Sequence, residues 1–226
     1  MSNDYWENVY QTKEKKQVSW YQVKDQKTLK RIEALDLKQD QNIIDVGSGA
    51  SILIDQLLEA EYKNLHVLDL SQTALNKTQA RLAKKGLDST KTTWLVDDVC
   101  TVNLPQQYFD LWHDRAVFHF LITDNQQQQY IHTMQKALKK GGILMLSTFA
   151  EDGPTQCSGL QIEQYNIDKL KMRLGNTFSL LEYDHELHIT PWGTSQRFLN
   201  SVWINSPHTL KNQRADLHPP QADKLG

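Results

Sequence analysis

A short apolar run that ends in two glycines constrains the fold of this chain more than any other feature of its sequence. Residues 42–46 read as a buried strand, and Gly47 and Gly49 allow a tight turn directly after it. Ser51 is placed to cap a helix that we expect to end near Ala60. A strand that passes through a glycine turn into a helix is typical of α/β proteins with parallel sheets.

The same alternation of strand and helix continues along most of the chain. Each parallel connection needs a long crossover, so this spacing predicts a mainly parallel sheet with helices on both faces. Ser71 and Asp124 are expected to cap two of the helices, which should end near Gly86 and Gly141. Further strands are expected at residues 65–70, 92–96, 109–113 and 143–149, and two further helices at residues 28–37 and about 166–174.

The last part of the chain departs from this alternation. Residues 178–189 and 196–204 are strand-like, and residues 190–194 read as the turn of a hairpin, so the last strand should be antiparallel. The expected fold is a Rossmann-like α/β domain over residues 1–205, with a seven-stranded, mostly parallel sheet and a C-terminal antiparallel hairpin. Residues 206–226 are polar and contain three prolines, which predicts a flexible C-terminal tail.

The composition bounds the possible partners. A chain of 226 residues fits one domain, and its formal net charge of -2 gives no basic excess for nucleic acid or an anionic membrane. The longest apolar runs are too short to span a bilayer and the N-terminus lacks the pattern of a signal peptide, so we expect a cytoplasmic protein. Cys100 and Cys157 have no CxxC spacing, so we expect neither a disulfide nor a metal site.

A carboxylate at the end of the second strand indicates the kind of ligand. Asp69 follows Gly47 by 22 residues, and an acid at that position can accept both hydroxyls of a ribose. Gly47 and Gly49 let the backbone approach a ligand where a side chain would clash. Together they predict an adenosine-containing ligand.

Residues 43–51 and 67–71 resemble the class I S-adenosylmethionine-dependent methyltransferases, and the resemblance covers roughly residues 5–204. In that family the glycine loop holds the methionine part of S-adenosylmethionine, the acid of the second strand holds the ribose, and a third acid reads the adenine amino group. Ser51 departs from the family, which often has a third glycine there. The resemblance implies cofactor contacts from Asp45, Gly47, Ser48, Gly49, Asp69, Leu70, Asp98 and the backbone of Val99.

A nicotinamide-dependent oxidoreductase is the main alternative for a glycine turn of this kind. Its G-x-G-x-x-G fingerprint would need a glycine at position 52, where this chain has Ile52. The closing hairpin also fits a methyltransferase sheet better than a dehydrogenase sheet. The sequence therefore favours a methyltransferase, with a cofactor-binding protein that has no turnover as a further alternative.

The stretch from Tyr108 to Phe120 supplies candidates near the transferred methyl group. Ligands of open parallel sheets bind beyond the carboxyl ends of the strands, which predicts His113, Asp114 and His119 near the sulfonium. Methyl transfer chiefly needs nucleophile, carbon and sulfur in line, but Asp114 or His119 could also take a proton from an amine or thiol acceptor. Alternatively, Asp114 forms a local ion pair with Arg115 and His119 packs in a helix.

Aromatic residues near the N-terminus carry a second resemblance. Residues 5–10 and 19–21 look like the N-terminal segment of a subgroup that includes eukaryotic elongation-factor lysine methyltransferases, in which the corresponding aromatics line the cofactor. This implies cofactor contacts from Trp6, Tyr10 and Trp20. Ordinary packing of these large side chains is the alternative.

Three segments are similar to those of a bacterial methyltransferase subgroup. They are the Trp-His-Asp-Arg motif at residues 112–115 and the loops at residues 149–159 and 190–198. We expect both loops at the acceptor side, where irregular segments usually set specificity. Cys157 has no paired base in sequence and reads as a spectator thiol. The expected acceptor is a small molecule, because the chain shows neither an added recognition domain nor a basic excess, and a protein lysine is the alternative.

Overall fold

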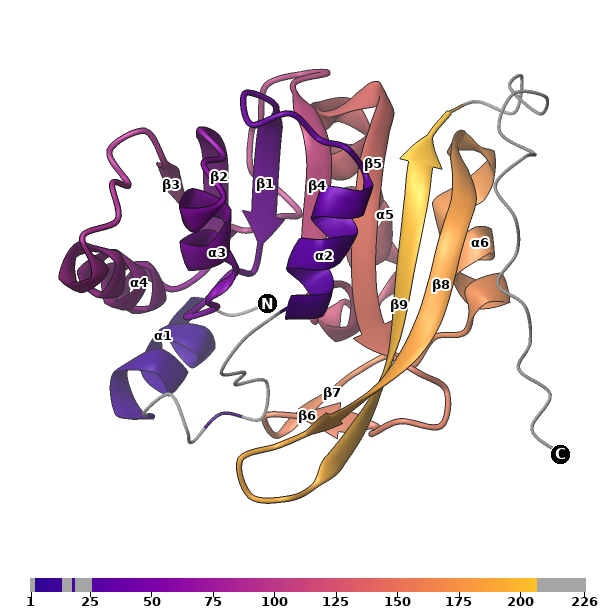
Figure 1. Cartoon of the computed structure of the whole chain (residues 1–226). Coiled ribbons are helices and arrows are strands. Elements are labelled where there is room, and N and C mark those ends of the chain that lie inside the picture. Colours follow the sequence, from indigo (N-terminus) through magenta and orange to yellow (C-terminus); the bar gives the residue numbers. More distant parts are fainter. Residues whose placement is uncertain (1–2, 14–17, 19–25, 207–226) are drawn as a thin grey trace, which may run out of the picture.

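The computed structural model describes residues 3–13, 18 and 26–206 (Figure 1). Its seven-stranded sheet has the order β3-β2-β1-β4-β5-β9-β8, which confirms the predicted Rossmann-like fold. Strands β1 to β5 run parallel, and β9 lies antiparallel between β5 and β8. The strands of this sheet are β1 (Asn42–Val46), β2 (Asn64–Asp69), β3 (Thr93–Val96), β4 (Phe109–Arg115), β5 (Leu138–Phe149), β8 (Phe178–Ile189) and β9 (Ser195–Asn205).

Helices connect the parallel strands and cover both faces of the sheet (Figure 1). None of the helices in the described part of the chain is long and apolar enough to cross a membrane. The predicted tail lies outside the described residues, apart from Ser206. The remaining elements are α1 (Asn3–Thr12), α2 (Gln26–Ala34), α3 (Leu53–Glu59), α4 (Gln72–Lys85), α5 (Asp124–Ala137), α6 (Ile167–Leu174), the 3-10 helices η2 (Phe118–Phe120) and η3 (Gly175–Thr177), and a small hairpin of β6 (Gln156–Cys157) and β7 (Leu160–Gln161).

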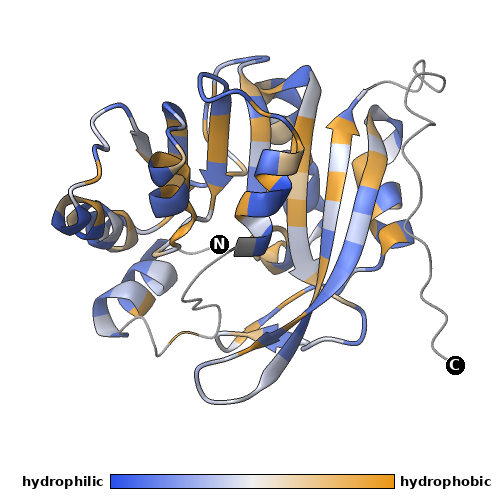
Figure 2. Ribbon diagram, viewed as in Figure 1, coloured by the Kyte–Doolittle hydropathy of each residue, from blue (hydrophilic) through white to orange (hydrophobic). Residues whose placement is uncertain are grey.

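Two apolar layers flank the sheet. On one face Tyr130 of α5 and Leu170 of α6 pack in a cluster with Trp112 of β4. On the other face Leu53 of α3 and Leu75 of α4 belong to a second cluster with the central strands. Figure 2 shows hydrophobic residues on β1 and hydrophilic residues on the outer turns of α4. Burial on both faces explains why the parallel strands read as short, nearly continuous apolar runs.

The helix ends follow local capping chemistry, with three corrections to the sequence interpretation. The Ser71 side chain accepts a hydrogen bond from the Ala74 amide at the start of α4, and Gly86 ends that helix in a left-handed conformation, as predicted. Asp124 is not the cap of α5, because Thr123 takes that position and exchanges hydrogen bonds with Gln126 in a capping box.

The starts of α3 and β5 also differ from expectation. Ser51 does not occupy the cap position of α3, which belongs to Ile52, although its hydroxyl accepts a hydrogen bond from the Leu53 amide (3.1 Å). Strand β5 begins at Leu138, directly after α5, so the residues up to Gly141 extend the strand instead of ending the helix.

Helix α1 lies beyond the carboxyl ends of β1 and β2 (Figure 1). The sequence did not reveal it as a helix, because most of its residues are polar and only Val9 and Tyr10 are buried. The ends of the parallel strands are where ligands bind in open α/β sheets. Helix α1 therefore covers the part of the fold in which a site is expected.

Candidate cofactor site

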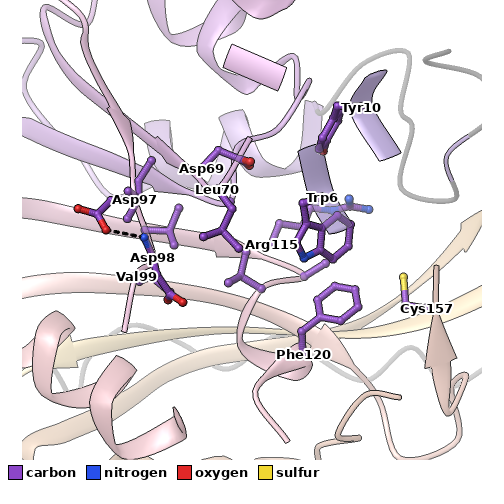
Figure 3. A pocket seen from close by; sticks show the side chains of 15 residues that line it. Trp6, Tyr10, Asp69, Leu70, Asp97, Asp98, Val99, Arg115, Phe120 and Cys157 are labelled. Atoms are coloured by element: carbon purple, nitrogen blue, oxygen red, sulfur yellow. Dashed lines mark hydrogen bonds between the residues drawn. The ribbon is translucent and has the colours of Figure 1, made fainter. Parts of the chain in front are cut away.

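A cavity of about 680 Å³, open to solvent, lies at the carboxyl ends of the parallel strands. In Figure 3 the acidic residues lie toward one end of the cavity, while Trp6, Phe120 and Cys157 lie toward the other. The residues expected to bind the cofactor that do line the cavity are Trp6, Tyr10, Gly47, Asp69, Leu70, Asp98 and Val99.

The glycine turn after β1 is tightly enclosed by other parts of the chain. Gly47 has a φ of +63°, and a Cβ added to it would lie 1.9 Å from Cγ2 of Val117. Gly49 has a φ of +53°, and its added Cβ would lie 2.0 Å from Oη of Tyr10. Both positions therefore require glycine for two reasons. The backbone is left-handed at each, and a side chain there would collide with Val117 or Tyr10.

Asp69 ends β2 and is held by two backbone amides. Its Oδ2 accepts a hydrogen bond from the Gly49 amide (2.7 Å), and its Oδ1 accepts one from the Ser71 amide (2.8 Å). Burial raises the pKa of Asp69 to about 6 although both hydrogen bonds favour the charged form. Each carboxylate oxygen can accept a further hydrogen bond, so Asp69 can still bind two hydroxyls of a ligand in the cavity.

The turn after β3 places a second carboxylate in the cavity. Oδ1 of Asp98 accepts a hydrogen bond from the Cys100 amide (2.9 Å). The Asp98 amide donates in turn to Oδ1 of Asp97 (2.7 Å), drawn as a dashed line in Figure 3. These bonds hold the turn in which Asp98 and Val99 line the cavity. A carboxylate, which accepts hydrogen bonds, beside a backbone amide, which donates one, suits an adenine ring.

Helix α1 supplies the aromatic wall. The indole of Trp6 packs edge-on against the ring of Phe120, with ring centroids 5.0 Å apart, and Tyr10 lies over Gly49. Both side chains line the cavity, in agreement with the position expected for them. Trp20 lies outside the described residues.

Four residues expected to contact the cofactor do not belong to the described lining of the cavity. Asp45 and His113 are neighbours on β1 and β4, and Oδ1 of Asp45 lies 2.7 Å from Nδ1 of His113, so the two buried side chains bind each other. Ser48 is also buried, and Gly49 lies behind the carboxylate of Asp69. Asp45 and His113 lie before the last residues of their strands, and Ser48 and Gly49 lie in the turn that follows β1.

Asp114, expected as a catalytic residue, faces away from the cavity. Its side chain is fully buried and accepts hydrogen bonds from Oη of Tyr130 (2.6 Å) and from the amides of Val117 (2.8 Å) and Phe118 (3.1 Å). Successive strand residues point to opposite faces, which places the side chain of Asp114 on the α5 side and that of Arg115 on the other side. In this structure Asp114 holds the turn after β4, and its side-chain partner is the neutral hydroxyl of Tyr130 in place of the expected Arg115.

His119, the other residue expected to be catalytic, is also fully buried and outside the described lining. Its Nδ1 accepts a hydrogen bond from the Phe149 amide (3.2 Å), and its ring packs 4.6 Å from that of Phe149. Burial, aided by the charge of Arg115, lowers the pKa of His119 to about 3. The imidazole is therefore neutral near pH 7 and packed in the core.

Eight residues that line the cavity were not predicted from the sequence as cofactor contacts, and most of them lie toward the end of the cavity that contains Trp6. The guanidinium of Arg115 lies over the ring of Phe198, 4.8 Å from its centroid. Ala116 has an unusual φ of +72°, which turns the chain after β4 and could not be foreseen from its residue type. The residues missed are Val46, Leu68, Asp97, Arg115, Ala116, Val117, Phe120 and Cys157.

The part of the chain described by the structure contains no group of three or more His, Cys, Asp or Glu side chains arranged to hold a metal ion.

The seven-stranded sheet, with β9 inserted antiparallel between β5 and β8, and the cavity at the strand ends define a Rossmann-like methyltransferase fold. Residues 43–142 match the methyltransferase domain family. Among curated proteins, the chain is similar to the eEF1A lysine and N-terminal methyltransferase of Bos taurus, with 23% identity over 147 residues. That match covers 64% of this chain but 20% of the bovine protein, so the chain spans about a fifth of this relative's length.

Solved structures show the same fold at low sequence identity. One is a protein studied for the conversion of a disulfide bond into a thioacetal group during echinomycin biosynthesis, with a TM-score of 0.74 and 16% identity, covering 92% of this chain and 94% of that one. Another is the 1,6-didemethyltoxoflavin-N1-methyltransferase of Burkholderia thailandensis, with a TM-score of 0.61 and 18% identity, covering 78% and 76%. At these identities the similarity establishes the fold.

Proposed function

We propose that the protein is an S-adenosylmethionine-dependent methyltransferase that acts on a small molecule. The observation that carries this proposal is the placement of Asp69, whose carboxylate is fixed by the amides of Gly49 and Ser71 at the edge of an open cavity. The match of residues 43–142 to the methyltransferase domain family supports the same reading.

The donor set of the cavity fits this cofactor. Asp69 would hold the ribose hydroxyls, Asp98 with the backbone of Val99 would hold the adenine, and Trp6 and Tyr10 would enclose the bound molecule from α1. The carboxylates also favour a cationic ligand. When bound, S-adenosylmethionine would supply a methyl group on a positively charged sulfur, and the sulfur would leave when an acceptor atom bonds to the methyl carbon.

The chain's contribution to the reaction is chiefly orientation. Holding two reactants in line supplies most of the catalysis that a displacement at carbon needs. The turn after β4, fixed by Asp114, directs Arg115, Ala116 and Val117 into the cavity. We assign Asp114 and His119 to the support of this turn and not to proton transfer, because both are buried away from the cavity.

The acceptor end of the cavity favours a small molecule. Trp6, Phe120 and Cys157 form apolar walls there, and Arg115 adds a positive charge. A lysine ammonium would meet a like charge at Arg115. The small-molecule methyltransferase from Burkholderia thailandensis has the same fold, and we further propose a cytoplasmic protein of the bacterial subgroup with the Trp-His-Asp-Arg motif.

A protein lysine methyltransferase is the second candidate, favoured by the similarity to the bovine eEF1A lysine and N-terminal methyltransferase. One experiment distinguishes the two candidate functions. The protein is incubated with methyl-labelled cofactor and a cell extract, and the labelled products are then fractionated by size. Our proposal expects label in the small-molecule fraction, whereas label on protein that depends on Asp69 would support the second candidate. A protein that binds the cofactor and labels neither fraction would be non-catalytic.

Calorimetric titration with S-adenosylhomocysteine tests the cofactor assignment directly. We expect the folded Asp69→Ala variant to bind at least about tenfold more weakly than the wild type, because two hydrogen bonds to a charged group are lost. The matched control is Asp88→Ala, which removes an exposed carboxylate that does not line the cavity. Equal affinity in wild type and Asp69→Ala would refute the assignment.

A further inference from the structure

Glu7 of α1 forms a polar connection to the start of α4. Its carboxylate accepts hydrogen bonds from the hydroxyl of Ser71 (2.7 Å), the amide of Thr73 (3.2 Å) and the hydroxyl of Thr73. These bonds, led by those from the two hydroxyls, lower the pKa of Glu7 to about 2. An anion is stabilised at this place because the first amides of a helix have no partner within the helix and carry partial positive charge.

The same contacts lead directly to the cofactor site. Ser71, whose hydroxyl donates to Glu7, also donates its amide hydrogen to Asp69 (2.8 Å), and Asp69 accepts from the amide of Gly49 (2.7 Å). Gly49 in turn lies against the ring of Tyr10, three residues after Glu7 on the same helix. The contacts therefore form a closed series that begins at Glu7 of α1, includes the carboxylate of Asp69, and ends at Tyr10 of the same helix.

Helix α1 has few apolar contacts with the rest of the fold besides the packing of Trp6 against Phe120. Only Val9 and Tyr10 are buried among its residues, and Glu7 lies between the two residues that line the cavity, Trp6 and Tyr10. Lys77 of α4 adds a hydrogen bond from its ammonium group to the carbonyl of Tyr10. The docking of α1 thus depends strongly on polar contacts with α4, of which those of Glu7 are the most numerous.

We propose that Glu7 is a positioning residue that latches α1 over the cofactor cavity, so that docking of α1 and binding of the cofactor stabilise each other. The inference rests on the proposed function and adds a means by which cofactor affinity is set. The coupling is reciprocal, because a ligand that contacts Trp6 and Tyr10 only when α1 is docked must favour the docked state.

The first test compares Glu7→Gln with Asp4→Asn, which removes a charge from the exposed side of the same helix. In calorimetric titrations with S-adenosylhomocysteine we expect Glu7→Gln to bind about tenfold more weakly and Asp4→Asn to match the wild type. Hydrogen exchange of the α1 amides supplies a readout independent of activity. S-adenosylhomocysteine should slow this exchange in the wild type, and in Glu7→Gln the exchange should be faster both with and without ligand.

A second variant tests whether Glu7 acts through α4. Thr73→Val removes one hydroxyl donor to Glu7, and the double variant Glu7→Gln/Thr73→Val should bind S-adenosylhomocysteine no more weakly than Glu7→Gln alone, because both changes break one connection. A role confined to capping α4 would lower the stability of the protein but leave ligand affinity and α1 exchange unchanged.

The outcomes separate the latch from the proposed function. If the wild type binds S-adenosylhomocysteine and Glu7→Gln binds it equally well, the latch is refuted and the proposed function stands. Additive losses in the double variant would also refute the latch. If the wild type does not bind S-adenosylhomocysteine at all, the proposed function fails and the inference fails with it.

Discussion

At the scale of single residues, two buried carboxylates show how position decides function. Burial raises the pKa of both Asp69 and Asp114 to about 6, so titration alone does not distinguish them. Their partners do: Asp69 is bound by two amides at the cavity edge, whereas Asp114 is enclosed by Tyr130 and the turn after β4. A strongly shifted pKa is an indication of a functional site only together with access to a ligand.

The pKa of Asp69 predicts how cofactor affinity depends on pH. The ionised carboxylate is the better acceptor for ribose hydroxyls, so the affinity for S-adenosylhomocysteine should rise as pH increases through about 6 and level off above it. Calorimetric titrations between pH 5 and 8 measure this profile, and Asp69→Asn should remove the rise. A profile that is equally steep in Asp69→Asn would assign the titration to another group.

Asp114 should act on stability. Its replacement in Asp114→Ala leaves the hydroxyl of Tyr130 and the amides of Val117 and Phe118 buried without their acceptor, which we expect to cost about 2–4 kcal/mol of unfolding free energy. Urea denaturation monitored by circular dichroism measures this loss. The milder Tyr130→Phe, which removes one of the three donors, should cost about 1–2 kcal/mol. Unchanged stability in Asp114→Ala would show that the turn does not depend on the carboxylate.

At the scale of elements, the sequence was most informative where local and tertiary preferences agree. Strand β1 was predicted with its observed limits, because an apolar run between polar residues and a glycine turn is consistent with burial on both faces. Helix α2 ends at Ala34 and not near Leu37, since Asp36 adopts a φ of +53°. Helix α1 was missed because its attachment depends on Glu7 and α4, which no local pattern reveals.

The contact between α1 and the glycine turn yields a prediction at this scale. In Gly49→Ala the new Cβ would lie 2.0 Å from Oη of Tyr10, so α1 must move away, and S-adenosylhomocysteine should bind at least about tenfold more weakly. Gly86→Ala is the matched control, because Gly86 has a similar φ of +69° but nothing within 4 Å of an added Cβ.

The two glycine variants should therefore separate strain from packing. Gly86→Ala should cost about 1 kcal/mol of stability through backbone strain alone and leave ligand binding intact. Calorimetric titration and thermal unfolding of both variants provide the comparison. Equal ligand affinity in Gly49→Ala and Gly86→Ala would mean that the packing of Tyr10 on Gly49 does not shape the cavity.

At the scale of the whole molecule, the sheet order brings distant segments to one site. The alternation of strands and helices was enough to predict the sheet and its hairpin. Asp69 ends β2 and Asp98 lies in the turn after β3, and both line the cavity. The other end of the cavity could not be predicted in the same way. It joins Arg115, the last residue of β4, with Cys157 of β6 and with α1, and no single stretch of sequence contains that combination.

The most direct test of the central claim is a crystal structure of the protein with S-adenosylhomocysteine. We predict that both ribose hydroxyls lie within hydrogen-bond distance of the carboxylate of Asp69 and that the adenine lies beside Asp98 and Val99. The sulfur should point toward the end of the cavity lined by Arg115 and Phe120. Binding at any other place, or a ribose that does not touch Asp69, would contradict it.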